Sequence, residues 1–390
     1  MRERNTATAL TLFVIAAFMA ALPQRAAATP GVKQVHCGVS GHTIGKALTK
    51  AEPGDTFLIS GFCPEKVTIT TDRITLDGQG TAILDGGGGA PTQFNAVILI
   101  DGVQGVVIKG FTIQNSTGEG ILGLRGAAFD VRQTTVQDNA GSGILVGDHS
   151  AANLTDCVMR RNSLGLDVFN ASSVVLKGVI TANNNTVFGG INVFGQSVIE
   201  IRGATVHVND NASFGLVVGG SQLVIFAFTE SQPSTLTAKS NGASGIVVLT
   251  GSLEVYPPQL PDNGTATITS ANNGADGIAL FNGFLVSPFG TARFVFENNK
   301  VGMNFGQGSG ATIVGGLTVQ NNATAGLLAD SADSLTLVSI PPNPSTILGN
   351  AARDMDLRFG TRMTVDGVAI GTMVCDRTVL SRGSTTCPNQ

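Results

Sequence analysis

Side chains suited to binding an acidic ligand recur at equivalent places in a repeating sequence. Aligning the repeats produces one outward column, whose members are Lys109, Arg132, Lys177 and Arg202, with Thr155 interrupting it. A ladder of bases can pair with the carboxylates of a linear acidic glycan. With charged residues from the same repeats added, the sequence predicts a glycan-binding surface, made of Lys109, Arg132, Arg160, Asp167, Lys177 and Arg202. The expected partner is an acidic polysaccharide.

A second polar column follows the first along the chain, and its members are Gln114, Gln137, Arg160 and His207. Both columns also have a plainer explanation. Long charged side chains keep one face of an elongated protein soluble and oppose its aggregation. Asp residues are interspersed among the bases, which is equally typical of a solvated mixed surface. A ligand-binding groove and a solvated face are therefore both open interpretations.

Short strands separated by Asn-Gly turns must position these columns. Apolar stretches follow a series of glycines, namely Gly120, Gly143, Gly165, Gly190, Gly215, Gly245, Gly277, Gly302 and Gly326. An Asn precedes each one, in the series Asn115, Asn139, Asn162, Asn185, Asn211, Asn241, Asn273, Asn299 and Asn322. Asn and Gly tolerate the left-handed backbone of sharp turns, and stacked Asn side chains can hydrogen-bond between coils. Apolar residues alternate after each glycine, so one side of each strand faces inward.

The repeat predicts an all-β fold, a right-handed single-stranded parallel β-helix whose coils stack about 4.8 Å apart. Solenoid ends need caps. Residues 43–51 have apolar side chains at helical spacing and predict an N-terminal capping helix. Insertions after Gly215 and Gly245 are expected to form loops that wall a groove. An aromatic stack is expected at one shared coil position, occupied by Phe169, Phe194 and Phe281, and stacking of these rings on a sugar is the second interpretation.

Several segments resemble the pectate-lyase-like right-handed β-helix superfamily. They are Thr43-Ile44 through Ala47-Leu48, Ala51-Glu52-Pro53-Gly54-Asp55-Thr56, Ile74-Thr75-Leu76-Asp77-Gly78 and the later coils. The resemblance extends over roughly residues 31 to 375. It implies a helix and a Pro-Gly-Asp turn that lead into the first coil. It implies no particular activity, because the superfamily includes lyases, hydrolases, epimerases, phage tailspikes and members without known activity.

The familiar catalytic residues of that superfamily are missing from this sequence. Glycoside hydrolysis requires carboxylates at a set separation, and β-elimination requires an Arg, Lys or His base beside a neutralised uronate. The nearest acidic group, Asp354-Met355-Asp356, stands alone, and the chain has no Trp and no Asp-Pro-His. No catalytic residue or subfamily is therefore assigned. If the chain is an enzyme, the basic column favours a polysaccharide lyase.

The five cysteines suggest two bridges near the chain ends, Cys37 with Cys63 and Cys375 with Cys387. Cys157 falls at an apolar position of a repeat and is expected to be a buried free thiol. No Cys/His spacing fits zinc, so the sequence predicts no metal site, and nothing in it predicts a cofactor. A net charge of −4 gives no electrostatic case for nucleic-acid binding.

The N-terminus has the order of a secretory signal peptide: Arg2 and Arg4, an apolar run, then small residues ending near Ala28. The predicted division is a signal peptide over 1–28, an N-terminal cap over 29–60, a β-helix over 61–375 and a tail with a disulfide loop over 376–390. No later segment predicts a membrane span. We therefore expect a monomer that is secreted, periplasmic or on the cell surface, where disulfides persist.

Two functional hypotheses follow. The first is an exported β-helix that binds, and in the stronger version modifies, polysaccharide; it depends on the basic column and on the resemblance. The second is a non-catalytic surface or structural protein, an adhesin-like array of repeats, and it depends on the missing catalytic residues.

Overall fold

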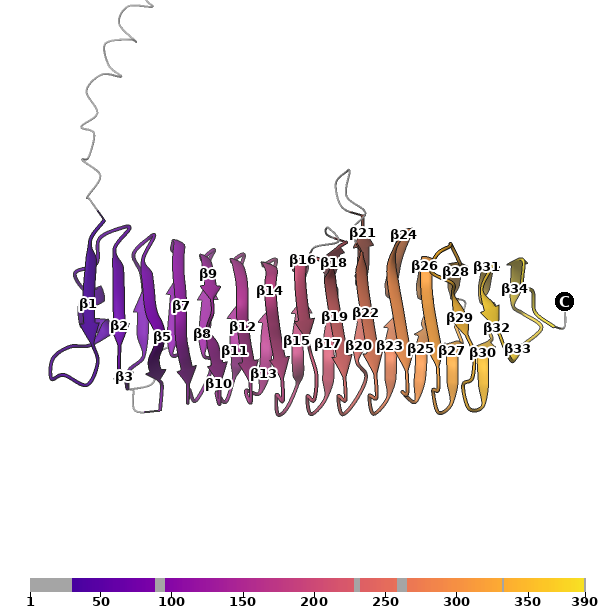
Figure 1. Ribbon diagram of the computed structural model, residues 1–390, viewed down its shortest axis with the longest axis horizontal. Coiled ribbons are helices and arrows are strands. Elements are labelled where there is room, and N and C mark those ends of the chain that lie inside the picture. Colours follow the sequence, from indigo (N-terminus) through magenta and orange to yellow (C-terminus); the bar gives the residue numbers. More distant parts are fainter. Residues whose placement is uncertain (1–29, 88–94, 228–231, 258–264, 332, 389–390) are drawn as a thin grey trace, which may run out of the picture.

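A computed structural model describes residues 30–87, 95–227, 232–257, 265–331 and 333–388. These residues form an elongated solenoid of parallel strands in which position along the long axis follows the sequence, from β1 (Val32–His36) to β34 (Leu380–Gly383) (Figure 1). The predicted signal peptide lies outside the described residues, as do residues 228–231 and 258–264 of the two predicted insertions.

Each turn of the solenoid has three faces, here named A, B and C. Face C is a 13-stranded parallel sheet. In chain order, its strands are β4 (Val67–Ile69), β6 (Ile98–Asp101), β8 (Ile121–Leu124), β11 (Ser142–Val146), β13 (Leu164–Val168), β15 (Gly189–Phe194), β17 (Phe214–Gly219), β20 (Ile246–Leu249), β23 (Asp276–Phe281), β25 (Val301–Gly306), β27 (Ala325–Ala329), β30 (Arg353–Leu357) and β33 (Met373–Cys375).

Faces A and B are joined by long strands that bend from one face to the other. These are β5 (Thr75–Asp85), β7 (Gln104–Gln114), β12 (Ala151–Arg160), β14 (Ser173–Asn183), β16 (Val198–His207), β24 (Phe284–Glu297) and β26 (Gly310–Gln320). Face A also contains β1, β2 (Thr56–Ser60), β9 (Ala128–Arg132), β18 (Gln222–Phe226), β21 (Ser252–Tyr256), β28 (Ser334–Val338), β31 (Arg362–Asp366) and β34. Face B also contains β3 (Phe62–Cys63), β10 (Thr135–Gln137), β19 (Ser234–Lys239), β22 (Ala266–Ala271), β29 (Thr346–Ile347) and β32 (Ala369–Ile370).

The bend in a long strand needs a left-handed residue. In β12 this is Asp156 (φ 54°), and in β14 it is Gly178 (φ 63°). A Cβ on Gly178 would lie 2.2 Å from Oδ1 of Asp156, the same oxygen that accepts a hydrogen bond from the Val179 N–H at 3.0 Å. Glycine is therefore required at this bend both by its backbone conformation and by the space available.

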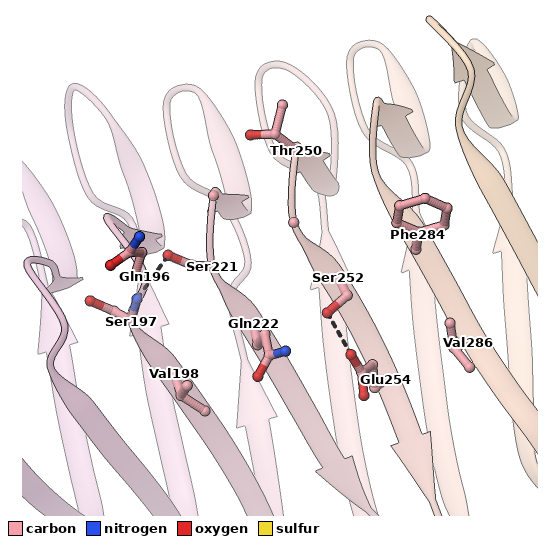
Figure 2. Close-up of a pocket in the computed structure, with 12 residues that line it drawn as sticks. Gln196, Ser197, Val198, Ser221, Gln222, Thr250, Ser252, Glu254, Phe284 and Val286 are labelled. Atoms are coloured by element: carbon pink, nitrogen blue, oxygen red, sulfur yellow. Dashed lines mark hydrogen bonds between the residues drawn. The ribbon is translucent and has the colours of Figure 1, made fainter.

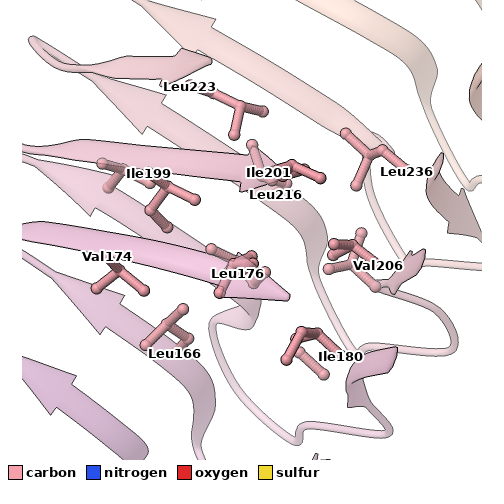
Figure 3. Close-up of a cluster of buried hydrophobic side chains, with 14 of the residues drawn as sticks. Leu166, Val174, Leu176, Ile180, Ile199, Ile201, Val206, Leu216, Leu223 and Leu236 are labelled. Carbon is pink, nitrogen blue, oxygen red and sulfur yellow. The ribbon is translucent and has the colours of Figure 1, made fainter. Parts of the chain in front are cut away.

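Aliphatic ladders fill the interior, as the alternation predicts (Figure 3). One ladder runs through successive register partners on the inner side of face A: Val131, Leu154, Leu176, Ile201, Ile225 and Val255. All six side chains have no exposed surface. Burial of each such side chain contributes roughly 1.5–3 kcal/mol, so the stacked interior is the main stabilising feature of the solenoid.

The predicted asparagine ladder is present at the corner between faces B and C. Its members are Asn139, Asn162, Asn185, Asn211, Asn241, Asn273, Asn299, Asn322 and Asn350, each at most 8% exposed. The backbone N–H of each one donates to Oδ1 of the next, at 2.9–3.1 Å. At the start of the ladder the Ser116 N–H donates to Asn139, so Ser116 and not Asn115 occupies that place.

The left-handed conformation expected of the ladder asparagines belongs instead to the residue before each one. Asp138 (φ 57°) precedes Asn139, and Arg161 (φ 54°) precedes Asn162. The ladder asparagines are required because their side chains replace backbone hydrogen bonds at the corner. Their backbone conformation is not the reason.

The ends of the solenoid are only partly as predicted. The expected helix over 43–51 is one turn, α2 (Ile44–Leu48), with Thr43 Oγ1 accepting from the Lys46 N–H at 3.1 Å. Ile44 is fully buried, but Gly45 is a weak helix former and the helix extends no further than Leu48. Both predicted disulfides, Cys37–Cys63 and Cys375–Cys387, are present.

Candidate functional site

The predicted basic column exists as a register on the outer surface of face A. In order along the solenoid it runs through Lys109, Arg132, Thr155 and Lys177 and then, across a shift in the register after Leu176, through Arg202, Phe226 and Tyr256. The bases are thus followed by two aromatic side chains. The Phe226 and Tyr256 ring centroids lie 6.3 Å apart, and the Arg202 guanidinium lies 4.8 Å from the centroid of the Phe226 ring.

The other two predicted site residues lie elsewhere. Arg160 is on face B, where its Nε donates to Oε1 of Gln137 at 3.0 Å. Asp167 is on face C, in register with Leu145 and Asn192. The six residues predicted to form one surface are therefore distributed over three faces, and only Lys109, Arg132, Lys177 and Arg202 share one.

The second polar column is confirmed as far as Arg160, but His207 does not belong to it. Gln114 pairs with Gln137, and Gln137 with Arg160. His207 pairs instead with Thr181, two residues before Asn183, which is the partner of Arg160. The register shifts at the bends of β12–β14 and of β14–β16, so a fixed offset counted along the sequence fails there.

Most bases of the face A column are paired with acids. Lys109 Nζ lies 2.9 Å from Oδ2 of Asp77, and Arg202 Nη2 lies 2.6 Å from Oε2 of Glu200. Arg132 forms an ion pair with Asp130. Lys177 is exposed and forms no ion pair with any described residue. Face A is consequently a surface of alternating charge, with little net attraction for a polyanion.

A groove of ≈ 540 Å³ lies on face A beside its corner with face C (Figure 2). Gln222, Ser252, Glu254 and Phe284 are among its lining residues. Glu254 accepts hydrogen bonds from Ser252 Oγ at 2.7 Å and from the Tyr256 hydroxyl. The hydrogen bond to Glu254 raises the pKa of Tyr256. The carboxylate is thus held in one place, and the exposed Phe284 ring provides an apolar surface nearby.

A serine ladder forms the corner beside this groove. Its members are Ser150, Ser172, Ser197 and Ser221, and each N–H donates to the next Oγ at 3.1 Å. Gly251 takes the next place, where a Cβ would lie 2.4 Å from the Ser221 carbonyl oxygen. Sequence reasoning missed this ladder and the groove. The usable signal was a serine directly before each of the four strands β12, β14, β16 and β18.

Two groups, the half-buried Asp167 and the buried Cys157, have strongly shifted pKa values. Burial, and then the nearby Glu119 charge, raise the pKa of Asp167 to about 6. Cys157 is buried and free, as predicted, and burial raises the pKa of its thiol to about 12. In the described ranges no three His, Cys, Asp or Glu side chains gather as a metal site. The same ranges contain no helix with the length and hydrophobicity of a membrane span.

The prediction of an aromatic stack is wrong for Phe169 and Phe194, the two predicted members that lie in adjacent coils. Phe169 and Phe194 are in adjacent coils but lie over glycines on opposite sides. A Cβ on Gly147, in the preceding coil, would lie 2.7 Å from the Phe169 ring, and one on Gly219, in the following coil, 2.3 Å from the Phe194 ring. The rings lean apart because glycine leaves space on those sides.

A family model supports the fold of the middle part of the chain. The family described as the right handed beta helix region matches residues 95–257. A search of curated protein sequences gave no match. Similar solved structures include an alginate lyase from a Paenibacillus species, with 14% identity, a TM-score of 0.38, and 71% of this chain and 98% of that chain covered.

Two other similar structures are alginate epimerases. The A-module of a mannuronan C-5 epimerase from Azotobacter vinelandii has 14% identity and a TM-score of 0.42, with 87% of this chain and 93% of that chain covered. A periplasmic alginate epimerase has 12% identity and a TM-score of 0.43, with 90% and 83% covered. The family match and the parallel coils identify residues 95–257 as a right-handed β-helix region, in agreement with the resemblance predicted from the sequence.

Proposed function

We propose that this protein is exported and binds a polysaccharide chain along face A. The observation that carries the proposal is the groove of ≈ 540 Å³, where a fixed carboxylate, Glu254, lies among amide, hydroxyl and aromatic side chains. Sugar sites combine a few placed polar groups with apolar surface. The groove crosses several stacked coils along the solenoid axis, which suits an extended ligand.

The ion pairs between bases and acids on face A change the expected charge of the ligand. The column contains four bases, namely Lys109, Arg132, Lys177 and Arg202. The same surface also carries four acids, namely Asp77, Asp130, Glu200 and Glu254. A polyuronate would therefore gain little from long-range attraction. We expect recognition mainly through hydroxyl groups, with Lys177 the base best placed to meet a carboxylate.

Binding is tested with the full mature chain against alginate, polygalacturonate, xylan and β-glucan, by affinity electrophoresis at low and high salt. Glu254→Gln and Tyr256→Phe should weaken binding of the preferred polysaccharide about tenfold, which corresponds to ~1.4 kcal/mol. Arg160→Ala, on face B, is the matched control and should bind normally. Raising the salt should change the affinity little, because the face is not a single-sign surface.

Failure of all four polysaccharides to bind, or equal loss in Arg160→Ala, would contradict the proposal and favour a structural role for the repeats. Turnover is a separate measurement. A lyase would generate new near-ultraviolet absorbance from polyuronates, and Lys177→Ala and Arg132→Ala should remove that absorbance while Arg160→Ala retains it.

A further inference from the structure

Another groove, here named the C-terminal groove, lies on β28, β31 and β34, the last three strands of face A (Figure 1). Its volume is ≈ 500 Å³. The polar residues that line it are two arginines and four residues with hydroxyl groups, namely Arg362, Arg382, Ser334, Thr336, Thr364 and Ser381. It shares no lining residue with the groove beside Glu254, which lies on β16, β18, β21 and β24.

The register of these strands brings the two arginines close together. Ser334 pairs with Arg362, and Thr364, two residues further along β31, pairs with Arg382. The burial pattern of β31 places Arg362 and Thr364 on the outer side of the sheet, and Arg382 shares that side as the partner of Thr364. The two arginines are therefore diagonal neighbours in adjacent coils, with Cα atoms roughly 8 Å apart at ordinary strand spacing.

Neither arginine is neutralised by a described residue. The guanidinium groups of Arg362 and Arg382 form no ion pair and donate no hydrogen bond within the described ranges. Arg353 and Arg358, by contrast, both form ion pairs with Asp356. The one acid in β28, β31 and β34 is Asp366, which does not line the groove. Two positive charges thus stand together without a counter-ion from the described part of the chain.

The strand that carries Arg382 is fixed in place by the C-terminal disulfide loop. Strand β34 pairs with β31 over its whole length. Between its first residue and Arg382 lies Ser381, whose Oγ accepts a hydrogen bond from the Cys387 N–H at 3.0 Å. Cys387 is bridged to Cys375. The backbone of the groove is therefore ordered before any ligand binds, which lowers the entropic cost of binding.

The donors of the C-terminal groove fit a tetrahedral oxyanion better than a carboxylate. One guanidinium satisfies both oxygens of a carboxylate through two parallel hydrogen bonds. Two guanidinium groups have donors for three or four oxygens, and the hydroxyl groups of Thr336 and Thr364 add two more. A phosphate ester carries about −1.5 to −2 charges at neutral pH, which nearly balances the two arginines.

We infer that the C-terminal groove binds a phosphate group, either on a small molecule in solution or on a lipid headgroup. Arg362 and Arg382 each donate one guanidinium, from two adjacent coils, and the hydroxyl groups of Thr336 and Thr364 donate to the remaining oxygens. The site needs no polysaccharide and none of the residues beside Glu254. It goes beyond the proposed function, since either can fail alone.

Calorimetric titration of the full mature chain with inorganic phosphate and glycerol phosphate tests the site in solution. Acetate and chloride at matched ionic strength are the comparisons. Both phosphates should bind, and acetate and chloride should not. Arg362→Gln and Arg382→Gln should each weaken phosphate binding at least tenfold, while thermal melting without phosphate stays unchanged. Arg362→Lys should restore part of the affinity, because it keeps the charge and loses the two-pronged geometry.

Arg377→Gln is the matched control. Arg377 is an exposed base in the loop between β33 and β34 that does not line the groove, so its loss should not change phosphate binding. Lys177→Ala and Glu254→Gln should also bind phosphate normally, which separates this site from the polysaccharide groove.

Sedimentation with vesicles distinguishes the two sources of the phosphate group. Retention on phosphatidic acid vesicles, but not on phosphatidylcholine vesicles, that is lost in Arg362→Gln and Arg382→Gln would assign the lipid headgroup. Binding in solution without retention would assign a small phosphate. The inference is overturned if neither form of phosphate binds, if acetate or chloride binds equally, or if Arg377→Gln loses as much affinity. The arginines would then serve only to keep the exposed end of the sheet from aggregating.

Discussion

The Asp167 carboxyl lies on face C, in register with the apolar side chain of Leu145 in the preceding coil. Burial, and then repulsion by Glu119, raise its pKa to about 6. Because the folded-state pKa lies above the unfolded one, protonation stabilises the fold. This contribution is fully present below about pH 4 and is lost as the pH rises through about 6.

We predict that Asp167→Asn raises the stability of the protein at pH 8 by roughly 1–3 kcal/mol, since about two pKa units of unfavourable ionisation are removed. At pH 4 the variant and the parent should be nearly equal. Urea unfolding at both pH values measures the difference. Glu200→Gln, on face A, is the control for the loss of one carboxylate. An equal gain in stability at pH 4 and pH 8 in Asp167→Asn would contradict the assignment of the effect to ionisation of Asp167.

At the scale of elements, the asparagine ladder is the strongest determinant of the corner between faces B and C. Asn299 Oδ1 accepts from the N–H and Nδ2 of Asn273, each at 3.0 Å, while its own Nδ2 donates to the Ser270 carbonyl at 3.0 Å. Removing this amide leaves buried donors and an acceptor unpaired.

We predict that Asn299→Ala lowers the free energy of unfolding by about 2–4 kcal/mol, because several buried hydrogen bonds are lost at once. Asn298→Gly is the matched control at the adjacent residue. Asn298 is exposed and left-handed (φ 56°), so glycine fits there and stability should change by less than ~1 kcal/mol. Equal effects in chemical unfolding would mean that the ladder side chains are not the stabilising feature.

Sequence reasoning predicted the coil, the inward alternation and the ladder because each repeats with the coil itself. Leu154, Leu176 and Ile201 are apolar because each of them is buried at the same place in its own coil. The position of His207 could not be predicted, because one extra residue at a bend shifts the register without changing the pattern of residue types. Glu254 was missed because its partners, Ser252 and Tyr256, occur in one coil only.

The predicted surface failed as a single site for a related reason. Equivalent positions in a coil share a face, but Lys177, Arg160 and Asp167 occupy three different positions of the coil. Side chains that are close in the sequence can therefore lie on different sides of the solenoid. Which of them meet depends on the bends, and the sequence marks the bends only weakly, with Asp156 at one and Gly178 at another.

At the scale of the whole molecule, stability is a sum over neighbouring coils, so the two ends are its weakest parts. The bridges Cys37–Cys63 and Cys375–Cys387 lie there. We predict that reducing both bridges increases amide hydrogen exchange in β1, β2 and β34 at least tenfold, while exchange in central strands such as β14 stays unchanged. Exchange that rises equally along the chain would show instead that the solenoid opens as one cooperative unit.

The asparagine ladder ends at an aspartate, although strands β31 to β34 continue the solenoid beyond it. The N–H and Nδ2 of Asn350 donate to Oδ1 of Asp354, at 2.9 and 2.8 Å. Although burial raises the pKa of Asp354, hydrogen bonds from Asn350 and Thr372 outweigh it and lower the pKa, so the group remains ionised. An ionised carboxylate accepts but cannot donate. Every Asn-to-Asn step before it repeats the same N–H to Oδ1 hydrogen bond, so we expect that one coil can be inserted or deleted between Asn139 and Asn350 without interrupting the ladder, whereas Asp354 cannot pass it on.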